Sequence, residues 1–228
     1  MLLLVTDTSG KHGSVALIRV SEGSEQNGVQ VIEEVPLAGG TFSAQLVPQI
    51  ATLLAKHGLS KTDVDAFIVV SGPGSFTGLR VGLAAIKALA EILHKPIVPV
   101  SLLEVVALVS HREGKVVAAL DAGRGEVYAG EYEIAAQSSQ VCGERLLTKD
   151  EFLSQADGSV VATTVASLAD AARLAGIPVD MIDGITAEMI AHLGWKKLLA
   201  GETVTPEKLE ANYIRRTDAE IFAKPSSS

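Results

Sequence analysis

The 228-residue sequence is short of cysteine, of positive charge and of long apolar runs. A single cysteine, Cys142, excludes an internal disulfide framework and fits a reducing compartment. No stretch offers the roughly 18 uncharged apolar residues that a membrane-spanning helix needs. The apolar start, residues 1–5, is followed at once by Thr6 and Asp7 and is too short for a signal peptide. We therefore expect a cytoplasmic protein with no membrane partner.

Positive charge is outnumbered, because 19 Lys and Arg stand against 27 Asp and Glu and give a formal net charge of −8. A protein that binds nucleic acid through phosphates needs clustered Lys and Arg. The sequence has only the short pairs Lys196-Lys197 and Arg215-Arg216, which are typical of solvated helix ends. The chain alone is therefore expected to be a poor nucleic-acid binder.

Familiar catalytic and metal-binding motifs are also missing. The five His residues form no i, i+4 pair and no H-E-x-x-H motif, so no metal site is predicted. The nucleophile motif G-x-S-x-G is absent. Cys142 has no His or Asn signature tied to it and is predicted to be a small core residue. We expect no metal, no cofactor and no catalytic residue.

Hydrophobic residues, in contrast, make up 47% of the chain, enough for a well-packed core. In the first half the pattern predicts strands at 2–6, 14–20, 29–35, 66–70 and 97–100, with helices at 43–57, 76–93 and 102–111. The second half begins the same way, with strands at 116–120, 126–134, 140–147 and near 160, and helices at 149–156, 167–175 and 187–200. This repetition predicts two similar lobes, residues 1–110 and residues 111–228.

Each predicted lobe begins with a strand that ends in Asp and a turn of small residues. Asp7 is followed by Thr8 and Ser9, and Asp121 by Ala122 and Gly123. Backbone N–H groups in such turns can cradle phosphates, and the two carboxylates can hold a metal through water if they face each other across a cleft. The alternative is that both Asp residues simply cap hairpins, and the residues alone leave both interpretations open.

The stretch from Ser71 to Lys87 is the most distinctive in the chain. A buried strand is expected to end at a Gly-Pro-Gly turn, and Ser75 is a good N-cap for the helix that follows. This helix is apolar nearly all round, which predicts burial on more than one side. Its smooth line contains Gly78, Gly82, Ala85 and Leu89. The helix lies either at the centre of one domain or also at a subunit interface.

Four segments together resemble the TsaB (YeaZ) family. They are Asp7-Thr8-Ser9 with 14–17, the long motif at 72–82, Pro99-Val100-Ser101-Leu102-Leu103-Glu104, and 121–128. The resemblance implies an α/β protein of the ASKHA (actin-like ATPase) fold, with two RNase-H-like lobes that contain mixed sheets. It also implies work in the synthesis of threonylcarbamoyladenosine (t6A), a tRNA modification, as a non-catalytic paralogue of the transferase TsaD.

The partners implied by the resemblance are TsaD and the ATPase TsaE, a homodimer when the chain is alone, and tRNA only through the complex. By our alignment, Leu102 and Val106 stand where TsaD has its metal-binding His pair, and neither can bind a metal. Ala211 stands where the family has Pro in its closing P-x-Y-x-R segment.

The expected partner interface lies on the first two predicted helices. It consists of Gln45, Gln49, Phe76, Thr77, Gly78, Arg80, Val81, Gly82, Ala85 and Leu89. A vestigial nucleotide cleft would contain Asp7, Thr8, Ser9, Asp121 and Gly123. The alternatives are an active ATPase or kinase of the same fold, which would use that cleft, and a peptidase, which the missing His pair disfavours.

Overall fold

The computed structural model describes residues 1–21, 28–110, 112–135 and 138–214. The Arg215-Arg216 pair and the last residue of the Tyr213-Ile214-Arg215 segment lie outside these residues. Within the described part, no helix has the length and apolar character needed to cross a membrane.

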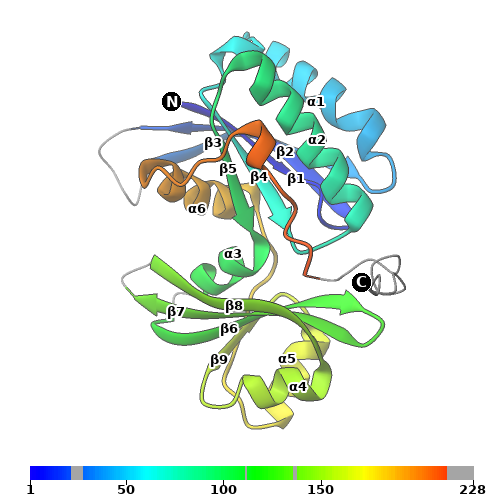
Figure 1. Cartoon of the computed structure of the whole chain (residues 1–228), viewed down its shortest axis with the longest axis vertical. Helices are drawn as coiled ribbons and strands as arrows, with labels where there is room; N and C mark the ends of the chain where they lie inside the picture. Colours follow the sequence, from blue (N-terminus) through cyan, green and yellow to red (C-terminus); the bar gives the residue numbers. More distant parts are fainter. Residues whose placement is uncertain (22–27, 111, 136–137, 215–228) are drawn as a thin grey trace, which may run out of the picture.

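The first lobe is built on a five-stranded mixed sheet in the order β3-β2-β1-β4-β5. Its strands are β1 (Leu2–Asp7), β2 (His12–Val20), β3 (Val29–Ala38), β4 (Ala66–Gly72) and β5 (Ile97–Ser101). The first three are antiparallel neighbours, whereas β1, β4 and β5 run parallel. Two helices, α1 (Phe42–Lys56) and α2 (Phe76–Leu93), lie side by side on one face of this sheet (Figure 1).

The second lobe repeats this plan with the sheet order β10-β9-β6-β7-β8. Its strands are β6 (Gly114–Gly123), β7 (Glu126–Ala135), β8 (Ser138–Thr148), β9 (Val160–Thr163) and β10 (Val179–Met181). The helices α4 (Lys149–Gln155) and α5 (Ala166–Leu174) pack against it. The predicted α/β class with two mixed sheets is thus confirmed, and β10 is an additional strand that was not expected.

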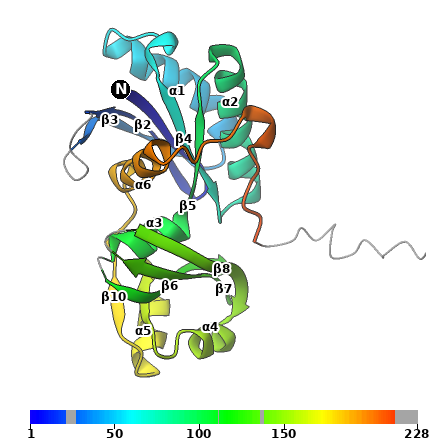
Figure 2. The ribbon, with the colours of Figure 1, turned by 60° about the vertical axis from the view of Figure 1, so that its left-hand side comes forward.

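The two lobes share elements, and the chain crosses between them more than once (Figure 2). Helix α3 (Leu102–Val109) packs on β6 and β7 of the second lobe and also against α6. Helix α6 (Ala187–Leu199) packs on β1, β2, β3 and β5 of the first lobe. The expected division at residue 110 therefore does not describe α6, because its apolar face, which includes Trp195, covers the open side of the first sheet.

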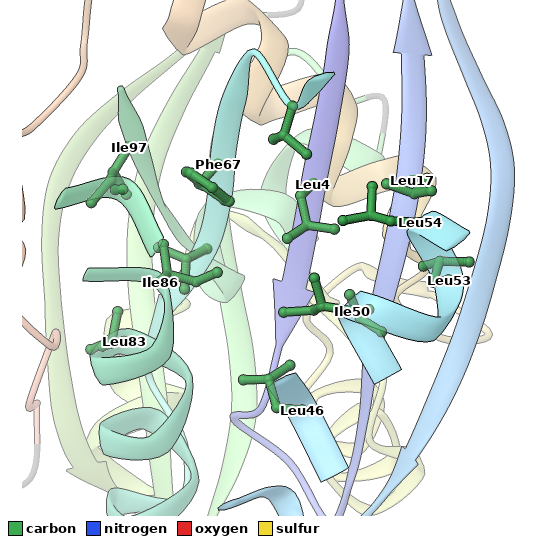
Figure 3. Packing of buried hydrophobic residues seen from close by; sticks show 14 of the residues in the cluster. Leu4, Leu17, Leu46, Ile50, Leu53, Leu54, Phe67, Leu83, Ile86 and Ile97 are labelled. Carbon is green, nitrogen blue, oxygen red and sulfur yellow. The ribbon is translucent and has the colours of Figure 1, made fainter. Parts of the chain in front are cut away.

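One core of the first lobe lies between its sheet and helices α1 and α2 (Figure 3). Leu4, Leu17 and Phe67 project from the strands toward Ile50 of α1 and Ile86 of α2. Full burial of each such side chain contributes about 1.5 to 3 kcal/mol, an upper range because the unfolded chain is already partly compact. This packing fixes both helices against the sheet.

The apolar pattern of 43–57 predicts that Val47 lies on the buried side of helix α1 and that Gln45 and Gln49 face solvent. In the structure Val47 is 50% exposed, whereas Gln45 and Gln49 are half-buried. The reason is that Phe42 at the first turn is buried together with Leu46 and Ile50, and this i, i+4, i+8 line sets the face that meets the sheet.

Candidate functional site

A pocket of about 1180 Å³ lies at the junction of the two lobes. The first lobe contributes the β1–β2 turn, which includes Ser9, and the first turn of α2, which includes Phe76. The second lobe contributes the β6–β7 turn with Asp121 and Gly123, and Tyr213 near the end of the described chain supplies a further wall. The pocket is large enough for a nucleotide-sized ligand.

The two Asp turns have the same local geometry. Asp7 Oδ1 accepts hydrogen bonds from the backbone N–H of Ser9 at 2.8 Å and from its hydroxyl at 2.6 Å. Asp121 Oδ1 accepts from the N–H of Gly123 at 2.8 Å. Both are Asx turns, which satisfy the backbone locally and account for the repeated sequence pattern. The capping interpretation therefore holds for both Asp residues, whatever else they do.

The two carboxylates are not equivalent in the pocket. Asp121 is exposed and lines it, whereas Asp7 does not line it. Burial raises the pKa of Asp7, against the two hydrogen bonds from Ser9, which lower it. Thr8 is also withdrawn from the pocket, because it is buried and its hydroxyl donates to the carbonyl oxygen of Gly78 at 2.8 Å. Of the five expected cleft residues, Ser9, Asp121 and Gly123 line the pocket.

Two cations that the sequence reasoning did not single out also line the pocket. Lys11 follows the first Asp turn and Arg124 lies in the second, with a left-handed φ of 57° between two glycines of positive φ. Among the described residues neither side chain has a hydrogen-bond or ion-pair partner. Positive charge at a pocket lined by two glycine-containing turns favours an anionic ligand.

The glycines of α2 allow the helix to pack closely against the β1–β2 turn of the same chain. Ser75 is the N-cap, as predicted, and its hydroxyl accepts from the N–H of Gly78 at 3.3 Å. Both Gly78 and Gly82 are buried. A Cβ added at Gly82 would lie 2.3 Å from Thr8 Oγ1, and one at Gly78 would lie 2.0 Å from the Thr8 carbonyl oxygen. The β1–β2 turn therefore occupies the part of the smooth line formed by Gly78 and Gly82, where a partner helix was expected.

The solvent-facing side of the helix pair remains a candidate interface. On α2, Thr77 and Arg80 are exposed, and Val81, Ala85, Leu89 and Phe76 are half-buried. Ala84, Ala88 and Ile92 continue the exposed side of α2, and Ile92 is 66% exposed. On α1, the Gln45 side chain is hydrogen-bonded within the chain itself. It accepts from the backbone N–H of Ala38 and donates to the Thr41 hydroxyl.

The two residues expected to stand in place of the transferase His pair, Leu102 and Val106, are apolar and buried. Leu102, at the start of α3, packs in the core that contains α6, and Val106 packs in the core of the second lobe. In the described part of the chain, no group of three or more His, Cys, Asp or Glu side chains could hold a metal ion.

A polar cluster near Ser101 was not foreseen from the sequence. Glu144 of β8 accepts hydrogen bonds from Ser101, Tyr132 and Asn212, which come from three separate segments. Burial, followed by the charge of Glu144, raises the pKa of Tyr132, so this hydroxyl stays protonated and donates. The sequence predicted a strand at 140–147, but nothing in it indicated that Glu144 faces inward or which residues it meets.

Comparison with known families places these features in context. The family model described as TsaD, tRNA N6-adenosine threonylcarbamoyltransferase, matches residues 36–212, more than half of the chain. The protein of Haemophilus influenzae named tRNA threonylcarbamoyladenosine biosynthesis protein TsaB is 38% identical over 131 residues, which cover 56% of this chain and 52% of that protein. The Bacillus subtilis protein of the same name is 33% identical, over 58% of this chain and 56% of that protein.

These matches span about half the length of the curated relatives, whereas the structural match covers nearly the whole chain. The structure of YeaZ from Pseudomonas aeruginosa superposes with a TM-score of 0.72 and 27% identity, covering 93% of this chain and all of that chain. Together with the two five-stranded mixed sheets, this likeness fits the expected two-lobe ASKHA-like fold. The chain therefore belongs to the TsaD family of proteins and, within it, to the TsaB (YeaZ) group.

Proposed function

We propose that this chain is a non-catalytic subunit of the cytoplasmic assembly that makes t6A in tRNA. It binds a TsaD-type transferase, works with a TsaE-type ATPase, and forms a homodimer when alone. Relatives named for threonylcarbamoyladenosine biosynthesis support the process. The observation that carries the non-catalytic role is the replacement of the aligned His pair by Leu102 and Val106, both packed in apolar cores.

The solvent-facing side of α1 and α2 is the proposed interface for the transferase and for the second copy. We define this α1/α2 face by Val47 of α1 and by Arg80, Ala84, Ala88 and Ile92 of α2, all exposed. Small side chains at 84 and 88 let another helix approach closely, and Val47 and Ile92 add apolar area that is costly to leave in water. Transferase and second copy share one fold, which supports a common face for both.

An in vitro reaction tests this function. A TsaD-type transferase, a TsaE-type ATPase, the threonylcarbamoyl donor and unmodified tRNA are incubated with and without the chain, and t6A is measured by mass spectrometry. We expect t6A only when the transferase and the chain are both present. Formation of t6A by the chain without the transferase would contradict the non-catalytic role, and equal yields with and without the chain would contradict the whole proposal.

The pocket favours a second candidate, an active ATPase or kinase of the same fold. Lys11 and Arg124 could contact phosphates there, and Asp121 could hold Mg²⁺ through water. Release of phosphate from ATP by the isolated chain, lost in Arg124→Ala and kept in Arg173→Ala on α5, would support this alternative. Release that stays at the background level in all three proteins would leave the subunit role as the remaining candidate.

A further inference from the structure

The last described segment, Leu209–Ile214, connects the two lobes, and we call it the C-terminal strap. It follows a short 3-10 helix, η2 (Pro206–Lys208), and runs past α2 toward the second lobe (Figures 1 and 2). Leu209 is buried in the first-lobe core beside α1 and α2. Ile214, five residues later, packs against the second-lobe core that contains Tyr128 and Tyr132. The strap thus begins in one core and ends on another.

The first attachment of the strap is to the end of β4. The backbone N–H of Asn212 donates to the carbonyl oxygen of Ser71 at 2.8 Å. Gly72 is in close contact with the same residue, because a Cβ at position 72 would lie 2.7 Å from the Asn212 carbonyl oxygen. This glycine, with a φ of 139°, allows the strap to approach the strand end.

The second attachment is the carboxylate of Glu144, on the edge strand of the other lobe. One oxygen accepts from the Asn212 side-chain amide. The other accepts from the Ser101 hydroxyl at 2.5 Å and from the Tyr132 hydroxyl. Ser101 ends β5 of the first lobe, and Tyr132 lies on β7 of the second. A single half-buried carboxylate therefore joins both lobes and the strap through hydrogen bonds to a charged acceptor, the stronger kind.

The third attachment is to the first turns of α2. Arg80 Nε donates to the Tyr213 hydroxyl at 3.0 Å. The Arg80 guanidinium carbon lies 3.7 Å from the centre of the Phe76 ring, and the Phe76 and Tyr213 rings are 5.0 Å apart. Arg80 belongs to the proposed α1/α2 face, so the strap connects that face to the lobe junction.

We propose that the C-terminal strap is a latch that keeps the lobes closed, with Glu144 as the positioning residue that fastens it. Asn212, Tyr213 and Ile214 form one wall of the pocket. Release of Asn212 from Glu144 would therefore open that wall and free Arg80 in the same event. The arrangement couples access to the pocket with the conformation of Arg80, and this coupling does not depend on the identity of the partner or of the ligand.

Amide hydrogen exchange of the isolated chain, followed by NMR, tests the latch without any partner. In Asn212→Ala and in Glu144→Ala, the amide of residue 212 should exchange about tenfold faster than in the wild type, as expected from the loss of a hydrogen bond to a charged group. The Arg80 Nε–H signal should shift in both variants, although neither replaced side chain contacts Arg80 in any described interaction. The failure of this test would leave the t6A proposal unaffected, because no partner is present.

Two controls separate the latch from general destabilisation. Ser139→Ala removes a 2.7 Å hydrogen bond to Glu104 from the same strand as Glu144, and it should leave residue 212 unchanged. Amides of the β6–β7 ladder, such as those of the Ala118–Gly130 pair, should exchange at the wild-type rate in every variant. If residue 212 keeps its wild-type rate in Asn212→Ala, or if Arg80 does not respond, the latch is wrong. If Glu144→Ala does not fold, Asn212→Ala tests the latch by itself, because position 212 lies in an irregular segment outside the helices and strands.

Discussion

Gly78 of α2 lies directly against Thr8 of the β1–β2 turn. The Thr8 hydroxyl donates a 2.8 Å hydrogen bond to the Gly78 carbonyl oxygen, and a Cβ at position 78 would lie 2.0 Å from the Thr8 carbonyl oxygen. The long motif at 72–82 is thus explained first by the way the helix meets its own sheet. A partner at this helix must use its other side.

Gly78→Ala should therefore destabilise the fold. Alanine favours a helix by about 1 kcal/mol over glycine, but the forced shift of backbone costs about 1 to 3 kcal/mol or more. We expect Gly82→Ala to destabilise the fold as well, because the atom it meets, Thr8 Oγ1, can move away only by giving up its hydrogen bond to the Gly78 carbonyl oxygen. Urea denaturation measures both. A Gly78→Ala variant as stable as the wild type would contradict this packing.

Asp7→Asn should stabilise the protein at neutral pH. The raised pKa of Asp7 means that its charged form is disfavoured in the folded state, chiefly by burial. The contribution of the Asp7 side chain to stability is fully present at pH values below its pKa in the unfolded chain. It is lost as the pH rises through the higher pKa of Asp7 in the folded protein. An Asn side chain can still accept from the Ser9 N–H. Melting temperatures of both proteins should differ at neutral pH and converge near about pH 4, close to the ordinary Asp pKa.

Glu104→Gln should destabilise the lobe junction. Glu104 is buried on α3, Lys197 Nζ of α6 lies 3.1 Å from it, and Ser139 of β8 donates to it at 2.7 Å. Burial alone lowers the pKa of Lys197, but Glu104 and Glu202 raise it overall, so the stability from this pair is fully present at neutral pH. Loss of one partner leaves Lys197 partly buried without its main counter-charge, at a cost of about 2 to 4 kcal/mol.

A double variant separates the ion pair from packing. Glu104→Leu with Lys197→Met should be closer to the wild type in urea than Glu104→Gln alone, because no buried charge is left unpaired. If Glu104→Gln unfolds at the same urea concentration as the wild type, the Glu104–Lys197 pair does not hold the lobe junction together.

Cys142 should react with a thiol reagent in the folded protein. It is exposed on β8, at the edge of the second sheet, where the prediction of a core residue was wrong. Its neighbours Gln140 and Val141 are exposed as well, so this stretch of the edge strand is open to solvent. We expect complete labelling without denaturant at about the rate of the unfolded chain. Labelling that requires urea would contradict the exposed position.

Local patterns predicted most of the helices and strands, because burial periodicity is a property of short segments. The predicted helix at 76–93 matches α2 (Phe76–Leu93), and the Ser75 cap is confirmed. The placement of α6 on the first sheet was not predictable, since the residues that it meets on β3 and β5 are far away in the sequence. Short strands such as β10 have too few residues for a periodic signal.

The candidate site was predictable only in part for the same reason. The Asp turns are local, so Asp7 and Asp121 stood out. The hydrogen bonds that join Glu144 to Ser101 and Asn212 bring together residues 43 and 68 positions apart, and no local pattern signals such pairs.

The most direct test of the proposed subunit role is the mass of the purified chain by light scattering, alone and mixed with a TsaD-type transferase. Ala88→Arg adds a bulky charge to the exposed side of α2, and Leu174→Arg makes a matched change at a 90% exposed position on α5. We expect a dimer alone, a one-to-one complex in the mixture, loss of both in Ala88→Arg, and no change in Leu174→Arg, with both variants folded by circular dichroism. A monomer that does not bind the transferase, or an Ala88→Arg variant that behaves like the wild type, would contradict the proposed α1/α2 face.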